Sequence, residues 1–198
     1  MTIAVDNRVT AEDYRALPEG GPQYQLIEGD LYMSPAPNRF HQDISRNIGL
    51  IIGNYLETHP IGTVYNAPFD VYLDHDNVFQ PDFVFVAREN YGVLTDAGVE
   101  GVPELVIEIL SPGTAKLDRN AKQRVYARCG VKEMWLVDPE TTTVAVYNLQ
   151  QNAVQPAAVY AIGDQFTSGF FPGLVFSVAR FFQAIRRPSG TSSTDSAP

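Results

Sequence analysis

Residues 104–112, ELVIEILSP, constrain the fold most strongly, because a segment that reads as a buried strand carries a carboxylate in its middle. Side chains alternate along a strand, so Glu108 points to the same side as Val106 and Leu110. Moving a carboxylate out of water costs several kcal/mol even after relaxation. Glu104 can lie at the exposed start of the strand, but Glu108 needs a cationic partner or a raised pKa.

A second carboxylate has a similar position in residues 81–86, PDFVFV, where Asp82 shares a face with Val84 and Val86. If the two strands are neighbours, carboxylates about 4 Å apart repel by roughly 4 kcal/mol at an effective dielectric constant of about 20. A divalent cation bound by Asp82 and Glu108 would remove this repulsion. Oxygen ligands suit magnesium or manganese better than zinc, and the chain has only three histidines and one cysteine.

The helix predicted over residues 117–130 offers a cation for this site. Its sequence, LDRNAKQRVYARCG, has one stripe at helical spacing, formed by Asp118, Lys122, Val125, Tyr126 and Cys129. Lys122 is the only basic residue of the stripe, and a helix that returns over the sheet would bring it beside Glu108. The alternative is that Lys122 extends toward solvent and pairs with Asp118 one turn earlier.

The order of the elements predicts an α/β (α+β) fold, with a mixed β-sheet flanked by helices. A short helix capped by Thr10 comes first, followed by a hairpin around Gly29 and Asp30. A long helix with one apolar face is expected from about residue 39 to residue 57. Several strands, the helix at 117–130, further strands and a short closing helix complete the pattern.

Length and composition suit one domain over residues 1–187, and the Ser/Thr/Pro-rich residues 188–198 are expected to form a disordered tail. No apolar segment is long enough for a membrane helix, and the N-terminus shows no secretory signal. A single cysteine, Cys129, fits a reducing compartment. These features predict a cytoplasmic protein with no membrane association.

The net charge of −9 counts against a broad, nonspecific nucleic-acid binder, whose surface is usually basic. The charge is unevenly distributed, because residues 113–132 carry six basic residues and one acidic residue, a local charge of +5. This segment is either a nucleic-acid contact or a solvated helix face.

Three segments, QPDFVFV, PELVIEILSPGT and LDRNAKQRVYARCGVKEMWLVDP, occur in an order and spacing that resemble a known family. YQLIEGDLYMSPAPNRFHQDI upstream and GDQFTSGFFPGLVFSV downstream extend the similarity over most of residues 10–184. The chain resembles the Uma family of restriction endonuclease-like bacterial proteins, a branch of the PD-(D/E)xK nuclease superfamily. The resemblance implies a restriction endonuclease-like core.

The resemblance also implies roles for individual residues. Asp82 would be the aspartate of the PD element and Glu108 the acidic residue of the (D/E)xK element, and both would bind the metal. Leu110 stands where that element has its lysine. In this branch the lysine has moved to the following helix, where Lys122 takes its place and Lys116 is the less favoured substitute.

Two further positions match the family. Glu28 corresponds to its N-terminal acidic residue and is expected to complete the catalytic set. His41 corresponds to a family histidine, although a histidine on the apolar face of a helix is more often a core residue.

The leading hypothesis is a DNA endonuclease that hydrolyses phosphodiester bonds with magnesium or manganese. The alternative is a noncatalytic module of the same fold that binds nucleic acid or serves in assembly, and the acidic net charge supports it. A glycosidase would use a carboxylate pair without metal or lysine. Cutting both strands of a duplex needs two sites, so a homodimer is expected.

Overall fold

The computed structural model describes residues 8–18, 22–34, 36–111 and 121–183. Its elements in chain order are α1 (Ala11–Arg15), β1 (Tyr24–Ile27), β2 (Asp30–Met33), α2 (Arg39–Thr58), β3 (Gly62–Asn66), β4 (Val71–Asp74), β5 (Asn77–Phe79), β6 (Phe83–Ala87), the 3-10 helix η1 (Arg88–Val93), β7 (Leu94–Thr95), β8 (Gly98–Glu100), β9 (Leu105–Ile109), α4 (Gln123–Cys129), β10 (Glu133–Asp138), β11 (Thr143–Asn148), β12 (Ala158–Ala161), β13 (Gln165–Phe166), β14 (Phe176–Ser177) and α5 (Val178–Phe181). The basic segment at 113–132 and the tail at 188–198 therefore fall partly or wholly outside the described residues.

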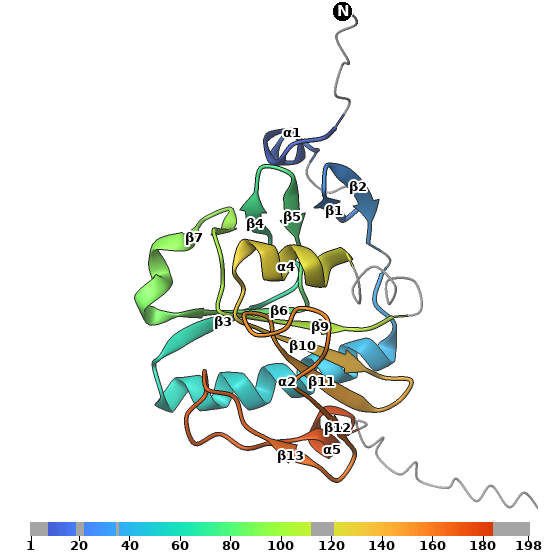
Figure 1. Ribbon diagram of the computed structural model, residues 1–198, viewed down its shortest axis with the longest axis vertical. Coiled ribbons are helices and arrows are strands. Elements are labelled where there is room, and N and C mark those ends of the chain that lie inside the picture. The colour runs from blue at the N-terminus through green and yellow to red at the C-terminus, as the bar shows by residue number, and fades with distance from the viewer. Residues whose placement is uncertain (1–7, 19–21, 35, 112–120, 184–198) are drawn as a thin grey trace, which may run out of the picture.

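The strands form two six-stranded sheets, ordered β2-β1-β5-β4-β8-β7 and β12-β11-β10-β9-β6-β3, and a small β13-β14 sheet. The first sheet lies above the second in Figure 1. Each large sheet is mixed, with one parallel pair, β4 with β8 in the first and β9 with β10 in the second. The expected fold class is confirmed, with two large sheets in place of one.

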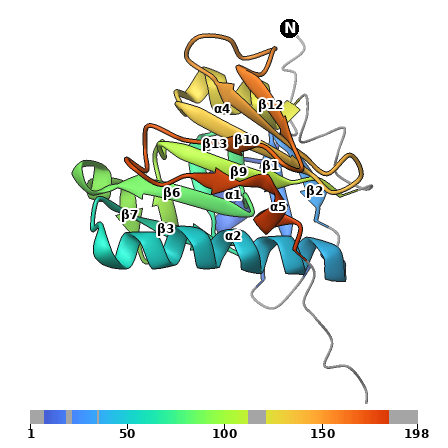
Figure 2. The same cartoon turned by 90° about the horizontal axis from the view of Figure 1, so that it is seen from below.

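Helices cover both faces of the second sheet. Figure 2 shows α2 along one side and α4 on the opposite side. The side chains of β9 alternate between two core clusters, one with α2 and α5 and the other with α4 and strands of the first sheet. All five residues of β9 are buried as a result, which explains its nearly continuous apolar sequence.

The β1–β2 hairpin turns through two residues with positive φ, Glu28 at 52° and Gly29 at 85°. Two consecutive left-handed residues match the tight hairpin turn that follows the twist of the strands. The predicted hairpin is therefore confirmed, with its turn at Glu28 and Gly29 in place of the expected Gly29 and Asp30, because Asp30 is the first residue of β2. Glu28 lies in the turn itself, beyond the end of β1.

Local signals account for the helix ends. Thr10 and Asp13 form a reciprocal capping box at α1. The side chain of Asn38 caps α2 by accepting a hydrogen bond from the backbone nitrogen of His41 at 3.0 Å. Gly130 ends α4 with a φ of 104°, as the sequence predicted. The cap at Asn38 places His41 in the first turn of α2.

Glu104 is buried, contrary to the expectation of an exposed strand start. Its Oε2 accepts a hydrogen bond from Ala87 N at 2.9 Å, and its Oε1 accepts one from Asn90 Nδ2 at 3.1 Å. Lys132 Nζ lies 3.5 Å from the same Oε1. The reason is the position of β9 between β6 and β10, which covers the start of the strand as fully as its middle.

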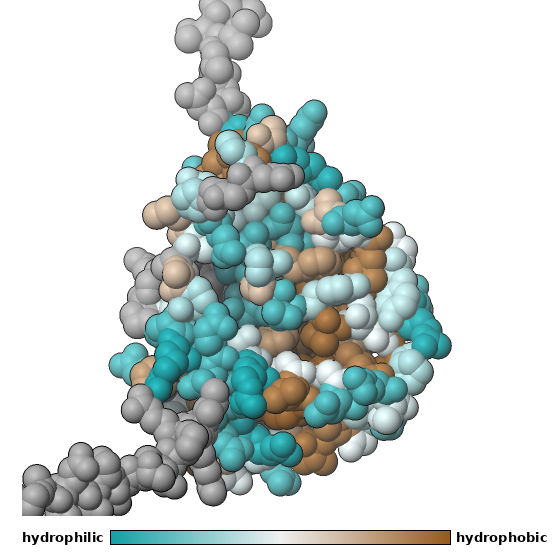
Figure 3. Space-filling view, turned by 180° about the vertical axis from the view of Figure 1, so that it is seen from behind, coloured by the Kyte–Doolittle hydropathy of each residue, from teal (hydrophilic) through white to brown (hydrophobic). Residues whose placement is uncertain are grey.

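The side of the molecule formed by α2 carries a groove of about 400 Å³ with a mixed lining, which includes Leu50 and Ile51 of α2, Leu174 and Val175 as well as Asn47, Asn54 and Arg180. Figure 3 views the molecule from this side and shows apolar side chains gathered on one half of it. None of the helices in the described ranges combines the length and apolar character that a bilayer crossing requires.

Candidate active site

Asp82 and Glu108 lie opposite each other because β6 and β9 pair antiparallel. Val84 pairs with Val106, and the same register, carried two residues further, sets Asp82 opposite Glu108. Opposite residues of an antiparallel pair project from the same face of the sheet. The prediction that the two carboxylate-bearing strands are neighbours is confirmed.

The carboxylate of Asp82 is held at both oxygens. Its Oδ2 accepts a hydrogen bond from Ile109 N at 2.6 Å. Its Oδ1 lies 3.0 Å from Nε2 of His41, which reaches the sheet from the first turn of α2. These contacts fix the direction of the carboxylate, as a metal ligand or a catalytic group requires.

Glu108 receives its cationic partner from the residue that immediately precedes α4. Lys122 Nζ lies 3.0 Å from Glu108 Oε1, and both side chains are more than 95% buried. The hydroxyl of Tyr126, one turn further along the helix, donates to the same oxygen at 2.8 Å. The predicted approach of this helix stripe to Glu108 is confirmed, and the catalytic role of Lys122 stays a prediction. Lys116 lies outside the described residues.

The electrostatics of His41 reflect the two carboxylates. Burial alone would lower the pKa of His41, but the hydrogen bond to Asp82 and the negative charges of Asp82 and Glu108 outweigh it, so the pKa is raised. The other ring nitrogen, Nδ1, is buried and has no hydrogen-bond partner within the described part of the chain. His41 is therefore more than a core residue, because it touches a proposed metal ligand.

One pocket of about 90 Å³ brings these groups together. Its lining consists of Gln23, Gln25, Ser34, Pro37, His41, Ala67, Gln80, Asp82, Glu108, Ile109, Ser111 and Lys122. Three predicted site residues, Asp82, Glu108 and Lys122, share this pocket although they come from three separate segments. His41 joins them from a fourth.

Sequence reasoning missed the amides of the pocket. Gln25 is 6% exposed, its Nε2 donates to Ser34 Oγ at 2.9 Å, and its Oε1 accepts from Gln80 N at 3.2 Å. A neutral amide carries no charge that would mark it as unusual. The sequence feature that could have identified Gln25 as a site residue is its position between Tyr24 and Leu26 in an apolar strand.

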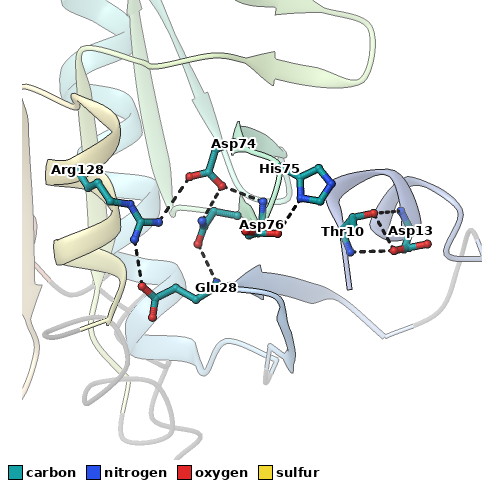
Figure 4. Close-up of polar contacts among 8 residues, drawn as sticks. Thr10, Asp13, Glu28, Asp74, His75, Asp76 and Arg128 are labelled. Carbon is teal, nitrogen blue, oxygen red and sulfur yellow. Dashed lines mark hydrogen bonds and ion pairs between the residues drawn. The ribbon is translucent and has the colours of Figure 1, made fainter. Parts of the chain in front are cut away.

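Glu28 contacts a different group of side chains, and Figure 4 shows it beside Arg128 and near Asp74. Arg128 Nη1 donates to Glu28 Oε1 at 3.2 Å, and Arg128 Nη2 lies 3.6 Å from Asp74 Oδ2. Glu28 lines a different pocket, shared with Arg8, Asp30, Asp76, Asn77 and Arg128. The structure therefore does not bring Glu28 to Asp82 and Glu108, because Glu28 lies in the hairpin turn while Gln25 of β1 reaches their pocket.

The donor set fits magnesium or manganese. Asp82 and Glu108 supply hard oxygen atoms at one pocket. The described ranges contain no group of three His, Cys, Asp or Glu side chains placed to hold a metal. Structural zinc sites use four protein ligands, whereas Mg²⁺ usually keeps several waters and is held by one or two carboxylates.

Comparison with known proteins agrees with this fold. The family model "Uma2: Putative restriction endonuclease" matches residues 11–179. No curated protein matches the chain. Among solved structures, a nuclease described as putative and as belonging to DUF820, from Anabaena variabilis, is 22% identical with a TM-score of 0.74, over 88% of this chain and 97% of that one. The match over residues 11–179 shows that the chain belongs to the Uma2 family, described as "Putative restriction endonuclease".

Proposed function

We propose that this protein hydrolyses phosphodiester bonds as a DNA endonuclease that requires magnesium or manganese. One observation carries the proposal. Asp82 and Glu108 line one pocket from paired strands, and Lys122 places its ammonium 3.0 Å from Glu108. Two carboxylates and a lysine are the groups that metal-assisted hydrolysis of a phosphodiester needs.

Asp82 and Glu108 are the residues that would hold the cation. When bound, the metal would lower the pKa of a water molecule and offset the negative charge that develops on the phosphate. Asp82 is already oriented by Ile109 and His41, and Glu108 by Tyr126. A site whose ligands are fixed before binding loses little free energy to reorganisation.

Lys122 has a separate role in this proposal. It is the only lysine or arginine among the described residues that line the pocket. Its ammonium would orient the attacking water or stabilise the negative charge on the phosphate oxygens. Because it approaches from α4, Lys122 can act there without taking a ligand position from Asp82.

A second candidate function is a noncatalytic module of the same fold. The supporting observation is the burial of Lys122 and Glu108, which can neutralise each other as a structural ion pair. The net charge of −9 is consistent with this alternative, since it opposes binding to a long phosphate backbone. Metal-dependent cleavage separates the two functions.

The deciding experiment incubates supercoiled plasmid with the purified protein in magnesium, in manganese or in chelator. We expect nicking or cutting in either metal and none in chelator or with Asp82→Ala. Asp96→Ala is the matched control, because Asp96 is an exposed acidic residue that does not line the pocket. Undiminished cleavage in chelator would contradict the metal-dependent mechanism. DNA binding without any cleavage would favour the noncatalytic module.

A further inference from the structure

Tyr32 projects from the face of the β1–β2 hairpin that borders the pocket. It pairs with Gln25 in the antiparallel register. Gln25 and Ser34 both line the pocket and are hydrogen bonded to each other at 2.9 Å. Opposite residues of a strand pair project from one face, and so do residues two apart on a strand. The tyrosine ring therefore lies next to the two pocket residues that the hairpin provides.

The ring of Tyr32 is available for a ligand. It belongs to an edge strand, β2, whose four residues are all exposed, and it is itself 38% exposed. Within the described ranges its ring has no aromatic or cationic partner and its hydroxyl no hydrogen bond. By contrast, Tyr65 stacks on Phe69 with ring centroids 4.3 Å apart. An exposed tyrosine alone is unremarkable, but this one shares a hairpin face with two residues that line the pocket, Gln25 and Ser34.

The volume of the pocket limits what can enter it. At about 90 Å³ it is far below the roughly 300–1,000 Å³ of sites that enclose a whole small molecule. A phosphate group with its water and cation suits this space, whereas a nucleoside does not. The sugar and base attached to a bound phosphate must therefore lie outside, and on the hairpin side they meet Tyr32.

We propose that Tyr32 stacks on an unpaired base beside the scissile phosphate, so that the preferred substrate is single-stranded nucleic acid. This inference rests on the proposed function, which assigns the phosphate to the pocket. A paired base has both faces covered by its neighbours, whereas a base in a single strand can offer a face to an aromatic ring. Stacking also supplies affinity without positive charge, which suits a chain with a net charge of −9.

The inference is tested by measuring nucleic-acid binding with a chelator present, because no cleavage is then expected and the test does not depend on it. A dye-labelled single strand of about 12 nucleotides and its duplex are titrated with protein, and binding is followed by fluorescence anisotropy. Wild type should bind the single strand more tightly than the duplex. Tyr32→Ala should weaken single-strand binding by roughly 5- to 150-fold, whereas Tyr32→Phe, which keeps the ring, should retain it.

Tyr91→Ala is the matched control, because Tyr91 is 40% exposed and does not line the pocket. It should leave binding unchanged. A single strand that contains 5-iodouracil should form a photochemical cross-link at Tyr32, identified by mass spectrometry of the peptides. The inference is overturned if the single strand does not bind, if the duplex binds at least as tightly, or if Tyr32→Ala has no larger effect than Tyr91→Ala. Failure of plasmid cleavage alone would overturn only the proposed function.

Discussion

The ammonium of Lys122 lies 3.0 Å from Glu108 Oε1, and both side chains are more than 95% buried. Burying two charges carries a desolvation cost that their attraction only partly offsets, so such a pair is weak evidence for a purely stabilising role. A neighbouring carboxylate, Asp82, lines the same pocket and adds negative charge. Lys122 faces Glu108, and His41 lies 3.0 Å from Asp82, so each of the two carboxylates has a basic group beside it.

Replacement of Lys122 by methionine keeps much of the side-chain volume and removes the charge. Turnover on plasmid DNA should fall by about 10²–10³-fold, because a preorganised positive group is lost from the reacting phosphate. The change also removes the ammonium that lies 3.0 Å from the buried Glu108 carboxylate and should lower the free energy of unfolding by about 3–5 kcal/mol. Activity is therefore measured per folded molecule, with circular dichroism to quantify folding. Lys116→Met should have little effect, and a larger loss from Lys116→Met would show that the lysine was assigned to the wrong position.

Tyr126→Phe removes one hydrogen bond to Glu108 and retains the ring that packs edge-on against Phe79. A hydrogen bond to a charged group contributes about 1.5–3 kcal/mol, so the free energy of unfolding should fall by that amount. Urea denaturation measures it. Tyr160→Phe is the control, because the hydroxyl of Tyr160 makes no hydrogen bond among the described residues. Equal effects of the two changes would contradict an anchoring role for Tyr126.

The raised pKa of His41 predicts a pH-dependent contribution to stability. Protonated His41 pairs with Asp82, so its contribution is fully present below the unfolded-state pKa of about 6.5 and is lost as pH rises through the higher folded-state pKa. The difference in melting temperature between wild type and His41→Gln should therefore shrink with rising pH. Thermal melts across this range measure it, and in an Asp82→Asn background the pH dependence should weaken or change sign, because burial of His41 then opposes only the smaller effect of Glu108. A difference that stays constant with pH would contradict the pairing.

Local patterns sufficed for most of the secondary structure and for the central site residues. The spacing of Ile44, Ile48 and Ile52 predicted the buried face of α2, and the two-residue turn predicted the first hairpin. Asp82 and Glu108 were recognisable because a charge within an apolar strand has an energetic cost that needs an explanation. Their positions are confirmed, whereas their chemical roles stay predictions, as do the single domain and the homodimer.

Long-range pairing accounts for what the sequence did not reveal. Two separate sheets depend on which distant strands meet, and local alternation is the same in either arrangement. The burial of Glu104 follows from the central position of β9. Gln25 is neutral, so no buried charge indicated in the sequence that it belongs to the site. Glu28 lies away from the pocket because β1 ends before it, and the sequence did not predict that end.

Glu108→Gln distinguishes a metal ligand from one half of a structural ion pair, because it keeps the shape and removes the charge. If Glu108 is a metal ligand, removing its charge relieves the repulsion with Asp82, which offsets part of the lost attraction to Lys122, so metal-free stability should fall by less than about 3–5 kcal/mol. Wild type at about ten times the dissociation constant for manganese should gain roughly 1.4 kcal/mol, or about 3–6 °C in melting temperature. The variant should gain nothing.

The structural ion pair predicts the opposite pattern in the same four thermal melts, of wild type and Glu108→Gln with and without manganese. The variant would then remove the charge that lies 3.0 Å from the ammonium of Lys122 and lose about 3–5 kcal/mol in the absence of metal. A large loss of metal-free stability, together with no manganese shift in wild type, would therefore contradict the assignment of a metal-dependent nuclease.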